Sequence, residues 1–238
     1  MIIEGKNAVS EALKGNVTIE KVMVQKDVQN KGIFQIVKEC RERKITVHTV
    51  EKSALDRLSP SGRHQGVLAI STEFTYSEFD ELLENKSEKG LLIIVLDGIE
   101  DPHNLGAIIR VAECAGADGI IIPRRRSCGV TDTAVKVSSG ASSYVKIAKV
   151  ANINDAVREL KERGVTVFAA DMDGESIYKT DLRGDVAFVI GGEGSGVHAL
   201  TRKLCDGVVS LPQNGKVNSL NASVATGIVV YECVRQKG

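Results

Sequence analysis

The sequence predicts an α/β fold class, with a mostly parallel sheet in the larger, C-terminal part. One observation is the continuous apolar run LLIIVLD from Leu91 to Asp97, which is typical of a strand buried on both faces. The other is that strand-like and helix-like segments alternate from this run to the end of the chain. Such alternation predicts helices on both faces of a parallel sheet.

A smaller α/β unit is predicted ahead of this part, in residues 1–72. Apolar spacing indicates a short helix over Ile3–Leu13, and the pattern of Gly32–Lys44 indicates a helix that ends in a basic turn. The segment Ser53–Ser59 is predicted as a short helix with a serine cap. Strands are predicted over Ile19–Gln25, Ile45–Val50 and Gly66–Thr72.

A shift in charge marks the boundary between the two parts. Residues 1–72 hold 12 Lys/Arg and 8 Asp/Glu, a net of +4, whereas residues 73–90 hold 2 and 6, a net of −4. We therefore predict a front domain at 1–72, an acidic linker at 73–90 with a short helix over Tyr76–Leu83, and a second domain at 91–238. The basic front domain fits an RNA-facing role, but an ordinary solvated surface explains its charge more simply.

The second domain is expected to continue the alternation of strands and helices. Strands are predicted at residues 91–97, 119–123, 144–148, 165–171, 185–193 and 207–213. Helices are predicted at residues 104–115, 131–139, 153–163, 197–204 and 219–236.

Composition excludes several classes of protein. The 238 residues carry a formal net charge of zero and no Trp, so neither a global basic signature nor a base-stacking platform is present. The five cysteines form no C-x-x-C pair and the four histidines lack metal-ligand spacing, so neither a disulfide framework nor a metal site is expected. No membrane-length apolar run or signal peptide is recognised, and a cytoplasmic protein is expected.

The first unusual loop follows the apolar run and reads LDGIEDPHNLGAIIR, residues 96–110. Pro102 disfavours helix at the residue before it, and Asn104 is placed to cap the next helix. Gly106 permits close backbone approach, and Arg110 is expected on the second turn of the helix. Taken alone, such an arginine is more often a surface or salt-bridge residue.

The second loop reads FVIGGEGSGV, residues 188–197, and places four glycines around Glu193. It offers bare backbone groups to a ligand. It is neither a P-loop, which needs a Lys and Ser/Thr after the glycines, nor the G-x-G-x-x-G dinucleotide fingerprint. A tight strand-to-helix turn explains the glycines equally well, but it leaves Glu193 unexplained.

The third loop and the helix after it read SLPQNGKVNSLNASVATGIVVYE, residues 210–232. One or two polar residues at a helix start need no function beyond capping, but four before a nearly all-apolar helix exceed what capping requires. The four are Asn218, Ser219, Asn221 and Ser223.

Each of these loops follows a predicted buried strand at its carboxyl end, where open α/β sheets place ligands. In order and spacing they resemble the three motifs of the SpoU family of RNA ribose methyltransferases, in the SPOUT superfamily. The patterns are N-x-G-x-x-x-R, then G-G-E-G-x-G, then L-P-x…N-S-L-N-x-S-x-A, and the resemblance covers residues 91–238. IEGKNAVSEAL and SGRHQGVLA resemble the RNA-binding front domain of the subgroup that methylates guanosine in 23S ribosomal RNA.

The resemblance implies a fold and a cofactor that periodicity does not show. Residues 91–238 are expected to form a trefoil-knotted SPOUT methyltransferase domain, and residues 1–72 a ribosomal-protein L30e-like domain that binds RNA. S-adenosylmethionine is the expected cofactor, held in a bent form largely by backbone atoms, with apolar side chains around its adenine. The positions matching the cofactor contacts are Ile190, Gly191, Gly192, Leu211, Pro212 and Leu220.

The reaction implied is 2′-O-methylation of a ribose, and no metal is needed for it. Family proposals let Arg110 activate the hydroxyl, but a guanidinium stays protonated in proteins, so gripping an adjacent phosphate is the alternative role. Glu193 is expected to hold Arg110 or orient the hydroxyl, and Ser219 and Asn221 to donate hydrogen bonds to ribose or cofactor. The matching catalytic positions are Asn104, Arg110, Glu193, Ser219 and Asn221.

The resemblance also implies a homodimer formed through the knotted domains, with the active site beside the interface. The apolar last helix (Val224–Val230) fits that interface, and core burial explains it equally well. His103 is expected to shape its loop, and His64 either contacts RNA or stabilises a turn. The run Arg124–Arg126 is either a solvated face or a grip on RNA phosphates, which would make binding salt-dependent.

Three alternatives remain open at this point. The same chemistry can act on a tRNA ribose or on an antibiotic-binding site of 23S RNA, although the front domain favours ribosomal RNA. The protein can be a ribosome-assembly factor whose methylation is incidental. A nucleotide-dependent α/β enzyme that acts without RNA is disfavoured by the absence of Walker and Rossmann fingerprints.

Overall fold

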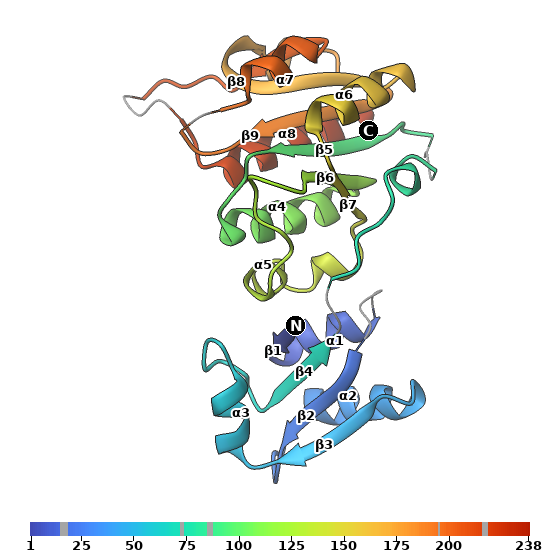
Figure 1. The fold of residues 1–238 in the computed structure, drawn as a ribbon, viewed down its shortest axis with the longest axis vertical. Coiled ribbons are helices and arrows are strands. Elements are labelled where there is room, and N and C mark those ends of the chain that lie inside the picture. The colour runs from blue at the N-terminus through green and yellow to red at the C-terminus, as the bar shows by residue number, and fades with distance from the viewer. Residues whose placement is uncertain (15–18, 72–73, 85–87, 195, 216–218) are drawn as a thin grey trace. The chain divides into compact units, whose positions relative to one another are not determined.

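The computed structural model describes residues 1–14, 19–71, 74–84, 88–194, 196–215 and 219–238. Two compact units make up the chain (Figure 1). Unit 1 contains residues 1–75 and 130–144, and unit 2 contains residues 76–129 and 145–238. Part of the acidic segment predicted as a linker thus belongs to unit 2, and a later segment of the chain belongs to unit 1.

Unit 1 is built on a four-stranded sheet in the order β1-β4-β2-β3. The pairs β1–β4 and β2–β4 are antiparallel, and β2–β3 is parallel. Its strands are β1 (Ile2–Glu4), β2 (Ile19–Gln25), β3 (Thr46–Val50) and β4 (Val67–Ser71). Its helices are α1 (Lys6–Lys14), α2 (Lys31–Glu42), α3 (Lys52–Leu58), α5 (Asp132–Val137) and the 3₁₀ turn η2 (Ala141–Ser143).

The helix predicted over residues 3–13 is confirmed from Lys6 onward as α1, but its first residues belong to the strand β1. The predicted serine cap of α3 is wrong. Ile2 pairs with Ile70 of β4, and Gly5, at φ +93°, turns the chain from β1 into α1. Hydrophobic spacing alone did not separate this short strand from the helix after it. Helix α3 starts one residue early, after Glu51, and has no side-chain cap.

A buried carboxylate holds α5 within unit 1. Glu4 is buried and accepts hydrogen bonds from Ser59, Ser61 and the ammonium of Lys136. Burial raises the pKa of the Glu4 carboxyl, but these hydrogen bonds outweigh it and lower the pKa to about 2. Glu4 is therefore ionised at neutral pH, and its contact with Lys136 is an ion pair.

The structure distinguishes the two roles considered for His64. This residue is 4% exposed, its Nδ1 accepts the Gly66 amide N–H at 3.0 Å, and its Nε2 lies 2.9 Å from Asp56 Oδ1. Since Nδ1 accepts, Nε2 carries the proton and donates to Asp56. Both ring nitrogens are therefore used inside the fold, and the turn-stabilising role is confirmed.

We expect His64→Ala to destabilise the protein by about 1–3 kcal/mol, because it leaves the Gly66 amide without an acceptor. Urea unfolding followed by circular dichroism measures this loss. The matched control is His48→Ala, which removes an exposed histidine from β3. Equal unfolding free energies for the two variants would contradict the structural role of His64.

Unit 2 is built on a six-stranded, fully parallel sheet in the order β10-β8-β9-β5-β6-β7. This confirms the predicted α/β class and the parallel sheet. The strands are β5 (Leu92–Asp97), β6 (Gly119–Pro123), β7 (Ile147–Val150), β8 (Thr166–Ser176), β9 (Val186–Gly191) and β10 (Gly207–Ser210). The helices are α4 (Pro102–Ala115), α6 (Ile153–Glu162), α7 (Ala199–Leu204), α8 (Ala222–Lys237) and the 3₁₀ turns η1 (Asp80–Leu82) and η3 (Ile177–Lys179).

The sheet is covered on both faces. On one face, Ile93 and Val95 of β5 join a buried cluster with Val157 and Leu160 of α6. Since alternate residues of a strand point to opposite faces, Ile94 and its counterparts on neighbouring strands face the other layer. That layer is formed by α4 and α8, which pack against each other and against β6 and β9.

The helix predicted over Tyr76–Leu83 is reduced to the short turn η1 (Asp80–Leu82). Leu82 is buried against β6, where a Cβ added at Gly119 would lie 2.3 Å from the Leu82 Cγ. Ser77 also forms a bridge with Ala148 beside β7. The segment thus lies along the sheet.

Within the described ranges, no helix is long and apolar enough to cross a membrane. The trefoil knot and the L30e-like fold of the front unit stay predictions.

Candidate active site

The three unusual loops start at one edge of the unit 2 sheet. They follow β5, β9 and β10, and because all strands are parallel, their carboxyl ends share an edge. The strands β5 and β9 are neighbours, with Asp97 opposite Gly191. The fold therefore places the first loop directly beside the glycine loop, defined here as residues 188–197.

The glycine loop folds back on itself closely enough to require glycine. Gly192 and Gly196 form an antiparallel bridge, and the Gly196 amide donates to the Gly192 carbonyl at 3.1 Å. A Cβ added at Gly191 would lie 2.0 Å from the Gly196 carbonyl carbon, a distance that real Cβ atoms do not reach. Gly194 and Gly196 have φ of +83° and +62°, which other residues adopt rarely. These glycines therefore shape the loop so that Glu193 stands at its tip.

Asp97, at the end of β5, ties this loop in place, and sequence analysis did not single it out. Its carbonyl accepts the Gly192 amide at 3.1 Å. Its carboxylate, 9% exposed, accepts the His198 amide at 3.0 Å and lies 2.9 Å from His198 Nδ1. Asp97 thus holds one side of the loop through its backbone carbonyl and the other through its buried carboxylate, which fixes the position of the residues between them. The only sequence signal was its place as the last residue of an apolar strand.

Asn104 does not cap α4, contrary to the prediction. The helix starts at Pro102, and Asp101 caps it by accepting the His103 amide at 2.8 Å. The Pro102 effect on the preceding residue is confirmed, because Asp101 has extended backbone angles. The Asn104 side chain, in a residue that is 6% exposed, is therefore available to reach out of the helix.

The three loops meet in a cluster of Asn104, Glu193 and Asn221. Asn104 Nδ2 donates to Glu193 Oε1 at 2.8 Å, and Asn221 Nδ2 donates to the same oxygen at 2.9 Å and to Asn104 Oδ1 at 2.8 Å. Among the described residues, Glu193 Oε2 has no hydrogen-bond partner. The cluster thus fixes a carboxylate through one oxygen and leaves the other available to a ligand.

Asn221 also caps α8, so a single residue joins the cluster to a helix. Its Oδ1 accepts the amides of Ser223 and Val224, at 3.0 and 3.4 Å, and the Ser223 hydroxyl at 2.6 Å. Both polar atoms of the Asn221 side chain are therefore used, Nδ2 in the cluster and Oδ1 in the cap of α8. Ser219 lies just ahead of it and is exposed, and Asn218 lies outside the described residues.

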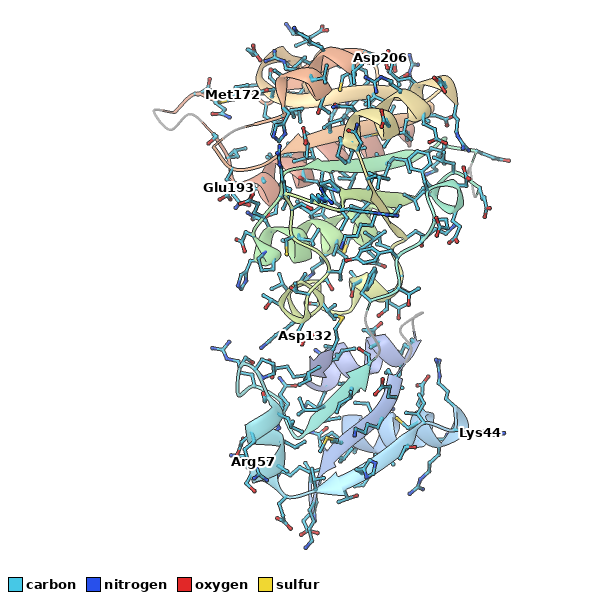
Figure 2. The ribbon with its side chains drawn as sticks, viewed as in Figure 1. Lys44, Arg57, Asp132, Met172, Glu193 and Asp206 are labelled. Atoms are coloured by element: carbon cyan, nitrogen blue, oxygen red, sulfur yellow. The ribbon has the colours of Figure 1, made fainter. Side chains whose placement is uncertain are left out.

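A pocket of 380 Å³ lies beside the cluster, which is the size of a small-molecule site. Figure 2 shows Glu193 and Met172 on the same side of unit 2, and both residues line this pocket. The walls of the pocket are formed by the backbone of the glycine loop, by apolar side chains at the strand ends and by the start of α8. The lining includes Ala170, Asp171, Met172, Ile190, Gly191, Gly192, Glu193, Gly194, Leu211, Ser219, Leu220 and Asn221.

Most of the predicted site residues come together at this pocket, and three do not line it. Pro212 is exposed and lies outside the lining, and Asn104 reaches the pocket only through Glu193 and Asn221. Arg110 is exposed on the third turn of α4, not the second, because the helix starts earlier than predicted. The residues that line the pocket are Ile190, Gly191, Gly192, Leu211, Leu220, Glu193, Ser219 and Asn221.

Asp171 and Met172 line the pocket and were missed because β8 is longer than predicted. This strand runs five residues beyond Asp171 and pairs with β10 through a register shift at Val208 and Val209. Strand order is a long-range property, so the sequence did not reveal that β8 would separate β9 from β10. The available signal was the place of Asp171 at the end of a predicted strand.

No cysteine is among the described residues that line this pocket. All five are free. Burial raises the pKa of both the Cys205 and the Cys233 thiol to about 11, so neither is a thiolate at neutral pH. In the part of the chain that the structure describes, no cluster of three or more His, Cys, Asp or Glu residues could hold a metal ion.

Two protein-family models match this chain. Residues 91–231 match the SpoU rRNA Methylase family, over a segment that contains all three loops and the pocket. The chain belongs to this family. Residues 2–77 match a second model, described as RNA 2′-O ribose methyltransferase substrate binding. This SpoU-family protein is thus an RNA 2′-O-ribose methyltransferase whose substrate-binding part precedes its catalytic part.

Individual relatives agree with this assignment. A protein of Staphylococcus haemolyticus (strain JCSC1435), placed in the TrmH family of tRNA/rRNA methyltransferases, is 41% identical over 241 residues, covering 100% of this chain and 96% of that one. An AdoMet-bound rRNA methyltransferase of Sinorhizobium meliloti is similar in structure, with a TM-score of 0.83, 27% identity, and coverage of 98% of this chain and 86% of that one. The TrmH/SpoU tRNA modifying enzyme of A. aeolicus has a TM-score of 0.57 and 28% identity, covering 66% and 80%.

Proposed function

We propose that this SpoU-family protein transfers a methyl group from S-adenosylmethionine to the 2′-hydroxyl of a guanosine ribose in 23S ribosomal RNA. The observation that carries the proposal is the Asn104–Glu193–Asn221 cluster beside a pocket of cofactor size. The cluster holds a carboxylate at the pocket wall with one oxygen available, which is the group that a reacting hydroxyl requires.

The pocket residues fit S-adenosylmethionine. Ile190, Leu211 and Leu220 supply apolar surface for an adenine ring, and the glycine-loop backbone supplies donors and acceptors without side chains in the way. The carboxylates of Asp171 and Glu193 line the same pocket and attract the positive charges of a sulfonium and an amino group. When bound, this cofactor supplies an electrophilic methyl group, so the protein needs no metal.

The role of the chain is to position the ribose hydroxyl and to stabilise its proton as it leaves. Glu193 Oε2 is placed to accept the hydrogen bond of that hydroxyl, while Oε1 stays anchored by Asn104 and Asn221. A guanidinium offers donors and no acceptor, so the role of Arg110 is to bind a phosphate next to the target ribose and not to act as a base. Ser219 is placed at the pocket wall to bond ribose or cofactor.

Ribosomal RNA is the favoured substrate because the structural similarity to an rRNA methyltransferase extends over nearly the whole chain. The rRNA methyltransferase of S. meliloti covers 98% of this chain, whereas the tRNA-modifying enzyme of A. aeolicus covers 66%. The substrate-binding match at residues 2–77 supports a front unit dedicated to RNA. An assembling ribosomal subunit and naked 23S RNA carry the same target.

The test is a substrate panel with labelled S-adenosylmethionine. Unmodified 23S RNA fragments, total tRNA and precursor subunits are each incubated with the protein, and label is counted on each RNA. We expect label on 23S RNA or its precursor subunit. Label on tRNA alone would contradict the ribosomal target. Binding to precursor subunits without methyl transfer to any RNA would favour the assembly-factor alternative.

We also propose that the protein acts as a homodimer through α8. This helix exposes an apolar stripe on one side, in which Val224 and Tyr231 are 50% and 48% exposed and Ile228 is half-buried between them. A stripe spaced at i, i+4 and i+7 is the pattern of a helix that packs against another surface. The stripe begins beside the pocket, since Asn221 caps the same helix.

We expect Tyr231→Lys to convert the dimer to a monomer, because two lysines would face each other across a two-fold interface. Sedimentation velocity measures the mass, and Phe34→Lys is the control, since Phe34 is exposed to 62% on α2 of unit 1. A monomeric wild type, or a dimer that survives Tyr231→Lys, would overturn the interface.

A further inference from the structure

The run Arg124–Arg126 lies at the same sheet edge as the active site. It directly follows β6, which is parallel to β5 with Ile121 opposite Val95. The Cys128 amide donates to the carbonyl of Ile99, in the first loop, at 2.8 Å. Because β6 is two strands from β9, the arginine run stands about 10 Å from the end of the strand that carries the glycine loop.

Backbone and side-chain bonds hold the run in a fixed path. The Arg124 amide donates to the Val150 carbonyl at 2.8 Å, and Arg124 Nε donates to the Lys149 carbonyl at 3.4 Å. The Ser127 hydroxyl donates to the Pro123 carbonyl at 3.0 Å. The arginine side chains therefore extend from a backbone that is tied to β6, β7 and the first loop.

The charge of the run is not neutralised by the described part of the chain. Arg125 and Arg126 are exposed, and neither forms an ion pair with a described residue. On the first loop, the Asp101 carboxylate is already used to cap α4. A surface guanidinium without a carboxylate partner is available to a phosphate, which it binds through two parallel N–H donors.

We propose that Arg125 and Arg126 bind backbone phosphates of the substrate RNA beside the target nucleotide. This inference rests on the proposed function, because it assumes that RNA enters the pocket at this edge. The contacts position the RNA and carry no sequence information, so specificity comes from other parts of the protein.

The experiment compares wild type with the double variant Arg125→Ala/Arg126→Ala. The control is Arg158→Ala/Arg183→Ala, which removes two exposed arginines that already pair with Asp155 and Asp181. Filter binding to an unmodified 23S RNA fragment is measured over a range of salt concentrations. Calorimetry gives the Kd for S-adenosylmethionine, and steady-state methylation gives kcat and KM.

We expect the double variant to bind RNA at least about 10-fold more weakly and to lose roughly 1.5 from the slope of log K against log salt, as for two phosphate contacts. Its KM for RNA rises, while kcat and the cofactor Kd match those of the control. An unchanged slope and RNA affinity would overturn the inference while leaving the proposed function standing. RNA binding without methyl transfer in the wild type would contradict the proposed function alone. Failure of the wild type to bind RNA would overturn both.

Discussion

Gly191→Ala is expected to weaken binding of S-adenosylmethionine by roughly 100-fold, or about 2.7 kcal/mol. A Cβ at this position would lie 2.0 Å from the Gly196 carbonyl carbon and 2.3 Å from the Val197 nitrogen. These are backbone atoms, so the loop has to open and the pocket wall moves with it. Calorimetry measures the cofactor Kd, and thermal unfolding verifies that the variant is folded.

The control for this prediction is Gly215→Ala. Gly215 lies in the third loop, and no atom of a described residue lies within 4 Å of an added Cβ, so we expect a cofactor Kd near that of wild type. A folded Gly191→Ala variant with wild-type cofactor affinity would contradict the assignment of the pocket. Equal losses in both variants would mean that any change near the loop weakens binding, and the argument from close approach would fail.

Glu193→Gln is expected to lower kcat by roughly 100- to 1,000-fold, the range seen when one preorganised group is removed from a reacting centre. Glutamine keeps an oxygen that can accept from Asn104 and Asn221, but it has no carboxylate to receive the hydroxyl proton. The cofactor Kd is expected to change by less than about 5-fold. Single-turnover methyl transfer at saturating cofactor separates the two quantities.

Glu175→Gln is the matched control, because Glu175 is an exposed carboxylate on β8. It should leave both kcat and cofactor affinity unchanged. A Glu193→Gln variant with wild-type kcat would show that this carboxylate takes no part in the reaction. A loss of cofactor affinity as large as the loss of kcat would assign Glu193 to binding instead.

The sequence predicted the elements whose burial leaves a clear pattern. The strands at residues 19–25 and 119–123 have the bounds that were expected, because apolar alternation and a β-branched run identify them locally. The three loops were found for a related reason, since glycines and polar residues interrupt otherwise apolar segments. Their meeting in one pocket follows from strand order, which brings β5 beside β9.

Long-range pairing and competition for caps account for what was missed. The strand Ile2–Glu4 exists because β4 lies beside it, and β8 extends past Asp171 because β10 pairs with it. At α4, Asp101 takes the cap in place of the predicted Asn104, because Pro102 occupies the first helical position. This choice leaves Asn104 for the site. In the sequence, Asp97 looks like an ordinary strand residue. Its role is visible only in the structure, where Gly192 and His198 are its hydrogen-bond partners.

The most direct measurement of the central claim is the identity of the methylated nucleoside. Unmodified 23S RNA is incubated with wild-type protein and methyl-labelled S-adenosylmethionine, digested to nucleosides and separated by chromatography with mass detection, with Arg110→Ala in parallel. The account predicts label in 2′-O-methylguanosine and its loss in the variant. Label in a base-methylated nucleoside, or equal label from the Arg110→Ala variant, would contradict it.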